Sequence, residues 1–177
     1  MKKFFLISIL FLFSCNRNKD EIFISKNTFI KKLSIDHIKD NEKRWTLFCD
    51  NAIVDEEKNF FKCYKTKIKV YKDNKIASII TSETGYGDIS VNSFYLKNNC
   101  QIISYLENID LLTQTINFDS KNEKIYSKDI TKILRKKENI EIISKGFEAK
   151  SDLSNIKFFN HTTHMINSNL HDIKPKI

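Results

Sequence analysis

Glycine, proline and arginine are scarce in this chain of 177 residues. It holds three glycines and a single proline, so few positions interrupt a regular backbone pattern. Arginine accounts for only three of the 30 basic residues, and the remainder are lysines. Arginine is the side chain that best forms bidentate contacts with phosphates and bases. The formal net charge of +8 therefore indicates a solvated lysine surface, and we expect no nucleic-acid partner.

The motifs of covalent chemistry are also missing. The sequence contains no G-x-S-x-G elbow and no H-E-x-x-H pair. The segment GYGD at 85–88 lacks the Lys-Ser/Thr pair that follows a phosphate-binding loop, so we expect a plain loop between strands there. Carboxylates alternate with lysines, and no two of them stand out as a general acid and base. We expect a protein that is not an enzyme and needs no cofactor; a hydrolase without a recognisable motif is the alternative.

Cysteine is infrequent too. After Cys15 only Cys49, Cys63 and Cys100 remain, and none of them forms a C-x-x-C pair. This spacing gives no support to a zinc site or to thioredoxin-like redox chemistry. Three cysteines allow at most one internal bridge, and small buried thiols are the expected state.

Three of the four histidines, His161, His164 and His171, cluster near the C-terminus. Two histidines three residues apart could share a metal ion, but a metal site also needs a rigid third ligand and a supporting second shell. This segment follows the last clear strand, so we expect a C-terminal tail at 161–177 without a metal.

The N-terminus has the pattern of an export signal. Lys2 and Lys3 precede a run of ten residues, 4–13, that is apolar except for one serine. As a helix this run would measure about 15 Å, half of the roughly 30 Å needed to cross a bilayer. The segment LFSC at 12–15 resembles the lipobox of bacterial lipoproteins, with a small residue directly before the cysteine. We expect a signal peptide at 1–14 and acyl chains on Cys15 that hold the protein on a membrane; an ordinary signal peptide is the alternative.

The chain between residues 45 and 160 is typical of an all-β domain. Ile68 and Val70 alternate with lysines and lead through KDNK into a second apolar run, which predicts a hairpin over 66–81. Short polar connections separate further runs of this kind, and no segment shows a convincing helical period. Strands are therefore predicted at 45–49, 66–81, 90–96, 100–106, 109–118, 124–134 and 140–147.

Residues 15–44 lack this alternation. Phe29, Leu33 and Ile38 hint at one helical face, but the flanking residues are weakly patterned. We expect a lipidated N-terminus and a tether that ends in one short element, followed by the β domain at 45–160.

The order of several short motifs resembles the lipopolysaccharide-export C component, LptC, and its OstA-like relatives. The segment WTLFCDNA at 45–52 is similar to the opening Trp-x-Leu strand of that family, and 109–129 to its Leu-x-Thr strand, turn and Ile-x-Ser strand. The segment GFEAKSDL at 146–153 resembles its C-terminal signature, in which Gly-Phe precedes acidic residues and a leucine. From the residues alone, we expect Gly146 to permit a turn there, with Phe147 and Leu153 on either side of it.

The resemblance implies an open β-jellyroll of two facing, mostly antiparallel sheets whose apolar groove conducts the acyl chains of lipopolysaccharide. The protein would sit in the periplasm, anchored to the inner membrane, and would receive lipid from an inner-membrane ABC transporter complex. It would pass the lipid to the next OstA-like jellyroll by edge-strand pairing. The groove candidates are Trp45, Leu47, Ile68, Val70, Ile116, Phe118 and Ile142. The partner-edge candidates are Gly146, Phe147, Leu153, Ile156 and Phe158.

The residues alone leave a second function open. A β-sandwich lipoprotein of the cell envelope that only binds proteins would have the same amphipathic strands, tether and open edges. Whether the inward side chains carry lipid or only pack against one another is the difference between the two hypotheses.

Overall fold

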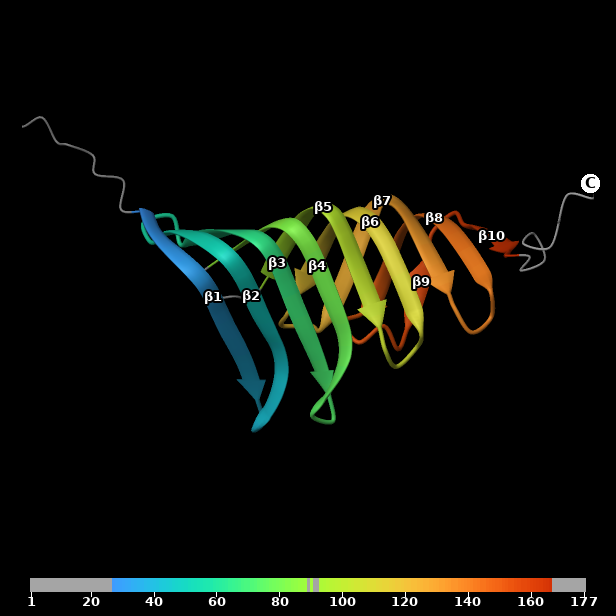
Figure 1. Cartoon of the computed structure of the whole chain (residues 1–177), viewed down its shortest axis with the longest axis horizontal. Coiled ribbons are helices and arrows are strands. Elements are labelled where there is room, and N and C mark those ends of the chain that lie inside the picture. The colour runs from blue at the N-terminus through green and yellow to red at the C-terminus, as the bar shows by residue number, and fades with distance from the viewer. Residues whose placement is uncertain (1–26, 89, 91–92, 167–177) are drawn as a thin grey trace, which may run out of the picture.

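The chain folds into one long antiparallel sheet, shown in the computed structural model of Figure 1. The structure describes residues 27–166 except positions 89, 91 and 92. Each strand pairs with the next in the sequence from β1 to β8; β10 then pairs with one half of β8 and β9 with the other half. The strands are β1 Asn27–Lys39, β2 Glu42–Asp55, β3 Phe60–Lys72, β4 Lys75–Asp88, β5 Ser93–Ser104, β6 Ile109–Asp119, β7 Lys124–Arg135, β8 Ile140–Lys150, β9 Ile156–Phe158 and β10 Thr162–Met165.

In the long strands, the two-residue alternation of buried and exposed side chains shifts by one residue near the middle. In β3, Phe61 and Cys63 are buried, and the next buried side chains are Thr66 and Ile68. The two-residue alternation therefore slips by one at Lys65, which has a φ of 50°. An extra residue of this kind bends a strand and lets the same face of the sheet stay inside on both sides of the bend.

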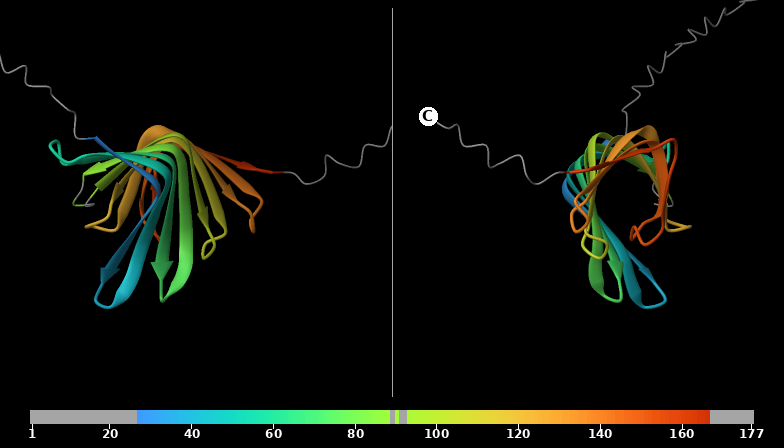
Figure 2. Two further views of the ribbon diagram at one scale, coloured as in Figure 1. Left: turned by 60° about the vertical axis from the view of Figure 1, so that its left-hand side comes forward. Right: turned by 90° about the vertical axis from the view of Figure 1, so that its right-hand side faces the viewer.

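The slips lie side by side across the sheet. Lys32 and Asp50 occupy neighbouring positions in β1 and β2, and Lys65 and Glu83 continue the row in β3 and β4. Register shifts mark the same level in the strands from β4 to β8. The bends therefore form one continuous line across the strands, which we call the fold line. Seen end-on, the sheet curves into an arch (Figure 2, right).

The fold line divides the sheet into two facing limbs. Limb A is made of residues 33–49, 66–82, 100–113, 130–145 and 162–165, and limb B of residues 27–31, 51–64, 84–88, 93–97, 115–127 and 147–158. The expected open jellyroll is confirmed, and its two facing layers are the halves of one continuous sheet.

Asparagine supplies the backbone conformations that glycine supplies in other β proteins. Eight of the 14 described non-glycine residues with positive φ are asparagines. In the turn between β3 and β4, Asp73 and Asn74 have φ values of 51° and 59°, as a type I′ hairpin turn requires. A chain with three glycines can therefore still make tight turns between its strands.

The expected tether is wrong for residues 27–44. Residues 27–39 form β1 and pair with β2 along its whole length. Leu33 and Ile35 pack against the core, whereas Phe29 and Ile38 are exposed. The slip at Lys32 interrupts the alternation of inward residues, which is why the segment did not resemble a strand in the sequence.

Two other boundaries need correction for related reasons. GYGD at 85–88 is the end of β4 and no loop; a side chain at Gly87 would come within 2.6 Å of the Phe61 ring. Residues 93–96 and 100–104 of the two runs predicted at 90–96 and 100–106 lie in a single strand, β5, in which Asn98 and Asn99 form the bend with φ values of 66° and 49°. The other predicted strands are confirmed, since β6, β7 and β8 cover the runs at 109–118, 124–134 and 140–147.

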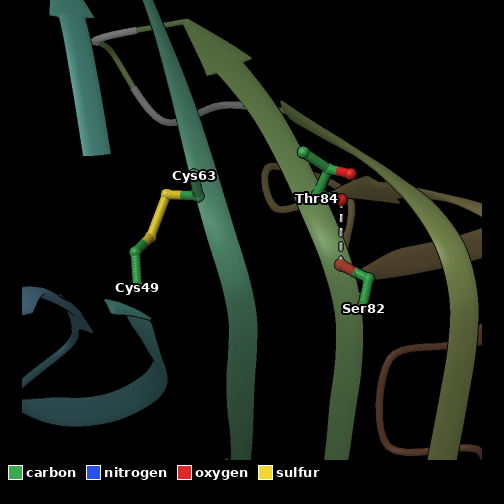
Figure 3. Close-up of a disulfide and its surroundings, with 4 residues drawn as sticks. All are labelled: Cys49, Cys63, Ser82 and Thr84. Atoms are coloured by element: carbon green, nitrogen blue, oxygen red, sulfur yellow. Dashed lines mark hydrogen bonds between the residues drawn. A yellow bond between two sulfur atoms is a disulfide. The ribbon is translucent and has the colours of Figure 1, made fainter. Parts of the chain in front are cut away.

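A disulfide bridges the fold line between β2 and β3. Cys49 lies in limb A and Cys63 in limb B, their Cα atoms are 5.5 Å apart, and both side chains are buried (Figure 3). The expectation of buried thiols is wrong for this pair and right for Cys100, whose thiol is buried. Burial, together with the nearby Asp129 carboxylate, raises the pKa of Cys100 to about 12.

Replacing both bridged cysteines (C49A/C63A) should lower the free energy of unfolding by about 2–4 kcal/mol, because the unfolded chain loses a cross-link. Urea unfolding measures this change. Adding a reductant should destabilise the wild-type protein by a similar amount and leave the double variant unaffected. A reductant effect on the double variant would show that the bridge is not its cause.

Candidate functional site

The space between the limbs is lined by side chains from both of them. All seven groove candidates lie there: Trp45, Leu47, Ile68, Val70 and Ile142 from limb A, and Ile116 and Phe118 from limb B. None of them is more than 7% exposed, and all belong to one apolar cluster. The alternation within each strand therefore predicted correctly which side chains point inward.

Aromatic rings connect the limbs across this interior. Trp45 of limb A meets Phe94 of limb B edge to face at 5.2 Å and Phe118 at 6.2 Å between ring centroids. Phe94 also lies 5.7 Å from Phe118 and 5.9 Å from Phe61. The interior is thus filled by its own side chains, and a guest molecule could enter only by displacing them.

The inside of the fold line is lined by small polar residues that the sequence did not single out. Thr113, Ser127 and Thr131 are buried there and form a hydrogen-bonded cluster at 3.2–3.3 Å. Ser82 donates to the Thr84 carbonyl at 2.9 Å (Figure 3). Hydroxyls can bind backbone groups left unpaired where the strands bend, and their small size lets the limbs converge. The interior therefore has a narrow polar apex and wider apolar walls.

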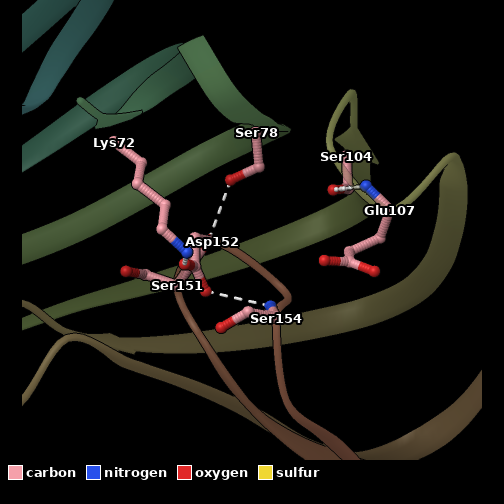
Figure 4. A network of polar contacts seen from close by, with 7 residues as sticks. All are labelled: Lys72, Ser78, Ser104, Glu107, Ser151, Asp152 and Ser154. Atoms are coloured by element: carbon pink, nitrogen blue, oxygen red, sulfur yellow. Dashed lines mark hydrogen bonds and ion pairs between the residues drawn. The ribbon is translucent and has the colours of Figure 1, made fainter. Parts of the chain in front are cut away.

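A loop at residues 151–155 crosses the open side of the arch. The Lys72 ammonium of limb A contacts the Asp152 carboxylate at 3.1 Å, and the Ser78 hydroxyl donates to the Ser151 carbonyl at 2.8 Å (Figure 4). The Ser151 amide donates to the Glu123 carbonyl at 2.8 Å. The first two contacts join the loop to the hairpin of β3 and β4, which lies 73 to 80 residues earlier in the chain, and the third joins it to the turn before β7. We call residues 151–155 the mouth loop.

Leu153 is the apolar part of the mouth loop. Its side chain is 1% exposed within the core cluster, although its backbone has a φ of 61°, which is unusual for leucine. Its amide donates to the Lys150 carbonyl at 2.9 Å. Leu153 thus fills the interior from the open side, where it covers the space that the limbs leave between their ends.

A cavity of about 210 Å³ lies beside the mouth loop. Trp45, Val70 and Phe118 form its apolar wall, and Lys72 and Asp152 stand at its rim. Three of the groove candidates therefore line this cavity. A larger cavity, of about 620 Å³, is lined by Phe48, Lys67 and Thr81 among others and lies at the outer face of the bend, away from the apolar interior.

The partner-edge candidates divide into two groups. Phe147 and Leu153 are buried in the core, and Gly146 lies in the middle of β8, where a Cβ atom would come within 2.6 Å of the Ser127 carbonyl oxygen. The prediction of an edge position is wrong for these three, and the predicted turn at Gly146 is the bend of β8, with a φ of 107°. Ile156 and Phe158 do lie at the edge, in β9.

Within the described residues, three strands at the two ends of the sheet have one unpaired side each. At the N-terminal end β1 offers an edge of 13 residues. At the other end β9 and β10 cover β8 and form the last strands, so residues 162–165 of the expected tail belong to the sheet. His161 and His164 are exposed there, and His171 lies outside the described residues. No cluster of potential metal ligands occurs in the part of the chain that the structure describes.

Within residues 27–166, the structure contains no helix of the length and apolarity needed to cross a bilayer. The expected signal peptide and the lipidation site, Cys15, lie outside the described residues.

The mouth loop should weaken in acid. Partial burial raises the pKa of Asp152, but hydrogen bonds from Ser154 and the contact with Lys72 outweigh it, so the pKa is lowered from its usual 3.8. A lowered pKa stabilises the folded state above that value, and the contribution is lost as the pH falls below it. Asp152→Asn should lower the free energy of unfolding by about 1–2 kcal/mol at pH 7 and by much less near pH 3.

Urea unfolding at both pH values measures the difference. Asp50→Asn is the matched control, because the Asp50 carboxylate is exposed and 3.6 Å from Lys65, an arrangement that contributes little. Equal losses for the two variants at pH 7 would contradict the assigned role of Asp152.

Comparisons with known proteins identify the fold. No protein-family model matches the chain, and no curated protein matches it in sequence. Among solved structures, the chain is similar to LptH of Pseudomonas aeruginosa, described as the LptA homologous periplasmic component of the conserved lipopolysaccharide transport device. The match has a TM-score of 0.51 at 9% sequence identity and covers 75% of this chain and 90% of LptH. The architecture described above is therefore that of an LptA-like β-jellyroll.

Proposed function

We propose that this chain is a periplasmic component of lipopolysaccharide transport, in which the interior between the limbs receives the acyl chains of the lipid. The observation that carries the proposal is the apolar cluster, which runs continuously along both limbs and contains all seven groove candidates. The similarity of the fold to LptH supports the same role. The protein performs no covalent chemistry in this proposal.

The interior would have to open for lipid to enter. Each apolar side chain that leaves a packed neighbour loses favourable contacts, and an acyl chain in its place restores them. Replacing side-chain contacts by acyl-chain contacts can therefore cost little net free energy. A lipid that moves from one protein to the next needs such a small difference between its bound and unbound states. The cavity beside the mouth loop gives an acyl chain a first contact with Trp45, Val70 and Phe118.

The two free edges would join this chain to its partners. A strand added to β1, or to β9 and β10, would continue the sheet and carry the fold line into the next molecule. In the finer form of the proposal, acyl chains on Cys15 hold the protein at the inner membrane, where it takes lipid from an ABC transporter complex as LptC does. A second OstA-like jellyroll then pairs with the opposite edge and receives the lipid.

Photocrosslinking tests whether the interior carries lipid. A benzoylphenylalanine residue at Ile116 or Ile142 should form an adduct with lipopolysaccharide in cells, because both side chains face the interior. The same residue at Ile130, which is 71% exposed, is the matched control and should form none. Inward positions that yield no lipid adduct while the protein remains folded would favour the alternative of a protein-binding lipoprotein.

A second crosslinking experiment tests the edges. Photoreactive residues at Lys39 in β1 and Lys157 in β9 should capture neighbouring jellyroll proteins, whereas Lys132 in the middle of the sheet should not. Capture from all three positions alike would mean that partners do not bind through the edges.

A further inference from the structure

The cavity of about 620 Å³ at the outer face of the bend has no part in the interior. Three lysines of one strand line it, Lys65, Lys67 and Lys69 of β3, together with Phe48 of β2 and Thr81 of β4. We call this cavity the lysine hollow. Residues two apart in a strand are separated by about 7 Å, which is within the roughly 10 Å over which charges repel each other at moderate salt. Three ammonium groups in such a line therefore cost free energy that a bound anion would offset.

The bend and the strand register bring these side chains together. Lys65 is the residue at which the alternation of β3 slips, with a φ of 50°. Lys67 is paired directly with Phe48 in β2 and with Thr81 in β4, so these three side chains stand on the same side of the sheet. The Lys69 ammonium lies 5.1 Å from the centre of the Phe48 ring. The hollow thus has cationic groups beside one aromatic wall.

The lysine hollow also contains two carboxylates, and both already have neighbours. The Asp50 carboxylate is 3.6 Å from the Lys65 ammonium, a distance that leaves the pair loosely held. The Glu83 carboxylate accepts a hydrogen bond from the Asn99 amide. Among the described residues, no carboxylate forms an ion pair with the other two lysines of the hollow. Their charge is therefore available to a ligand.

The wider surface around the hollow is positive as well. Within four residues of the slip in each strand from β1 to β5, the charged side chains are seven lysines and three carboxylates. They are Lys31, Lys32, Lys62, Lys65, Lys67, Lys69 and Lys97, and Asp36, Asp50 and Glu83. All other carboxylates of these strands and of the turns between them lie five or more residues along the chain from the slip, which is about 17 Å or more. A surplus of four positive charges therefore surrounds the hollow.

The use of lysine and the surplus of charge together favour phosphate as the anion. An arginine guanidinium is a planar fork that matches a carboxylate, and neither of the two described arginines, Arg44 and Arg135, lines the hollow. A lysine ammonium is a compact charge with three donors, so several lysines can approach one phosphate from different directions. A phosphate group also offers more acceptor oxygens and more negative charge than a carboxylate.

We infer that the lysine hollow binds a phosphate-bearing ligand. The ammonium groups of Lys65, Lys67 and Lys69 would donate to the phosphate oxygens. The Phe48 ring would pack against the group that carries the phosphate. The hollow lies on the opposite side of the sheet from the interior, so its ligand is a second molecule that binds independently of acyl chains between the limbs. Phospholipid headgroups and soluble phosphorylated molecules share this chemistry, and different probes separate them.

The test uses the full chain in dodecylmaltoside and measures the phosphorus NMR line width of three probes: inorganic phosphate, glucose 6-phosphate and dihexanoylphosphatidylglycerol. At least one line should broaden when the protein is added. Broadening of the lipid alone identifies a bilayer headgroup, and broadening of a soluble probe identifies a free phosphorylated molecule. Lys67→Gln and Lys69→Gln should each weaken binding by about fivefold, because each removes one charge-assisted hydrogen bond.

Lys75→Gln is the matched control. It removes one charge from the exposed start of β4, ten residues along the chain from Lys65, so it should leave binding unchanged. Circular dichroism should show equal melting of all variants. The inference is overturned if no probe line broadens, or if Lys75→Gln weakens binding as much as Lys67→Gln does. It is also overturned if succinate competes with the responding probe as strongly as inorganic phosphate does, which would make the hollow a site for any dianion.

Discussion

The structure depends on one constraint, which is that the strands must bend without turning their apolar side chains outward. An extra residue in a strand both bends it and shifts its two-residue alternation by one, so the same face of the sheet stays inside on both sides of the bend. Because the shifts in the alternation at Lys32, Asp50, Lys65 and Glu83 are adjacent, one fold line crosses the sheet. The disulfide between Cys49 and Cys63 connects the limbs across this line.

The interior follows from the fold line. Small hydroxyl residues occupy the apex because the limbs converge there, and branched and aromatic side chains fill the wider space below. Trp45 spans that space to reach Phe94 and Phe118. On the open side, the mouth loop supplies Leu153 and a charged pair between Lys72 and Asp152. Under the proposed function, this packed interior stays closed until lipid enters.

Sequence patterns predicted the features that depend on residues close together in the chain. They missed the features that depend on contacts between distant segments. The alternation of Ile68 and Val70, or of Ile116 and Phe118, identified inward faces correctly because each pair lies within one limb. The slips concealed β1 and divided β5 in two, since each slip restarts the period. The disulfide partners and the burial of Leu153 depend on contacts between segments distant in sequence, which no local pattern contains. The signature at 146–153 was placed at an edge, but its glycine serves the bend and its leucine the interior.

The central claim is that the limbs separate to admit acyl chains. It is tested most directly by the distance between spin labels placed at Asn74 in limb A's hairpin turn and at Lys121 in limb B's turn, introduced as an unnatural amino acid so that the native cysteines stay intact. Double electron–electron resonance should show this distance lengthen when lipopolysaccharide is added and return when the lipid is removed. A distance that does not change while lipopolysaccharide is bound would contradict the claim.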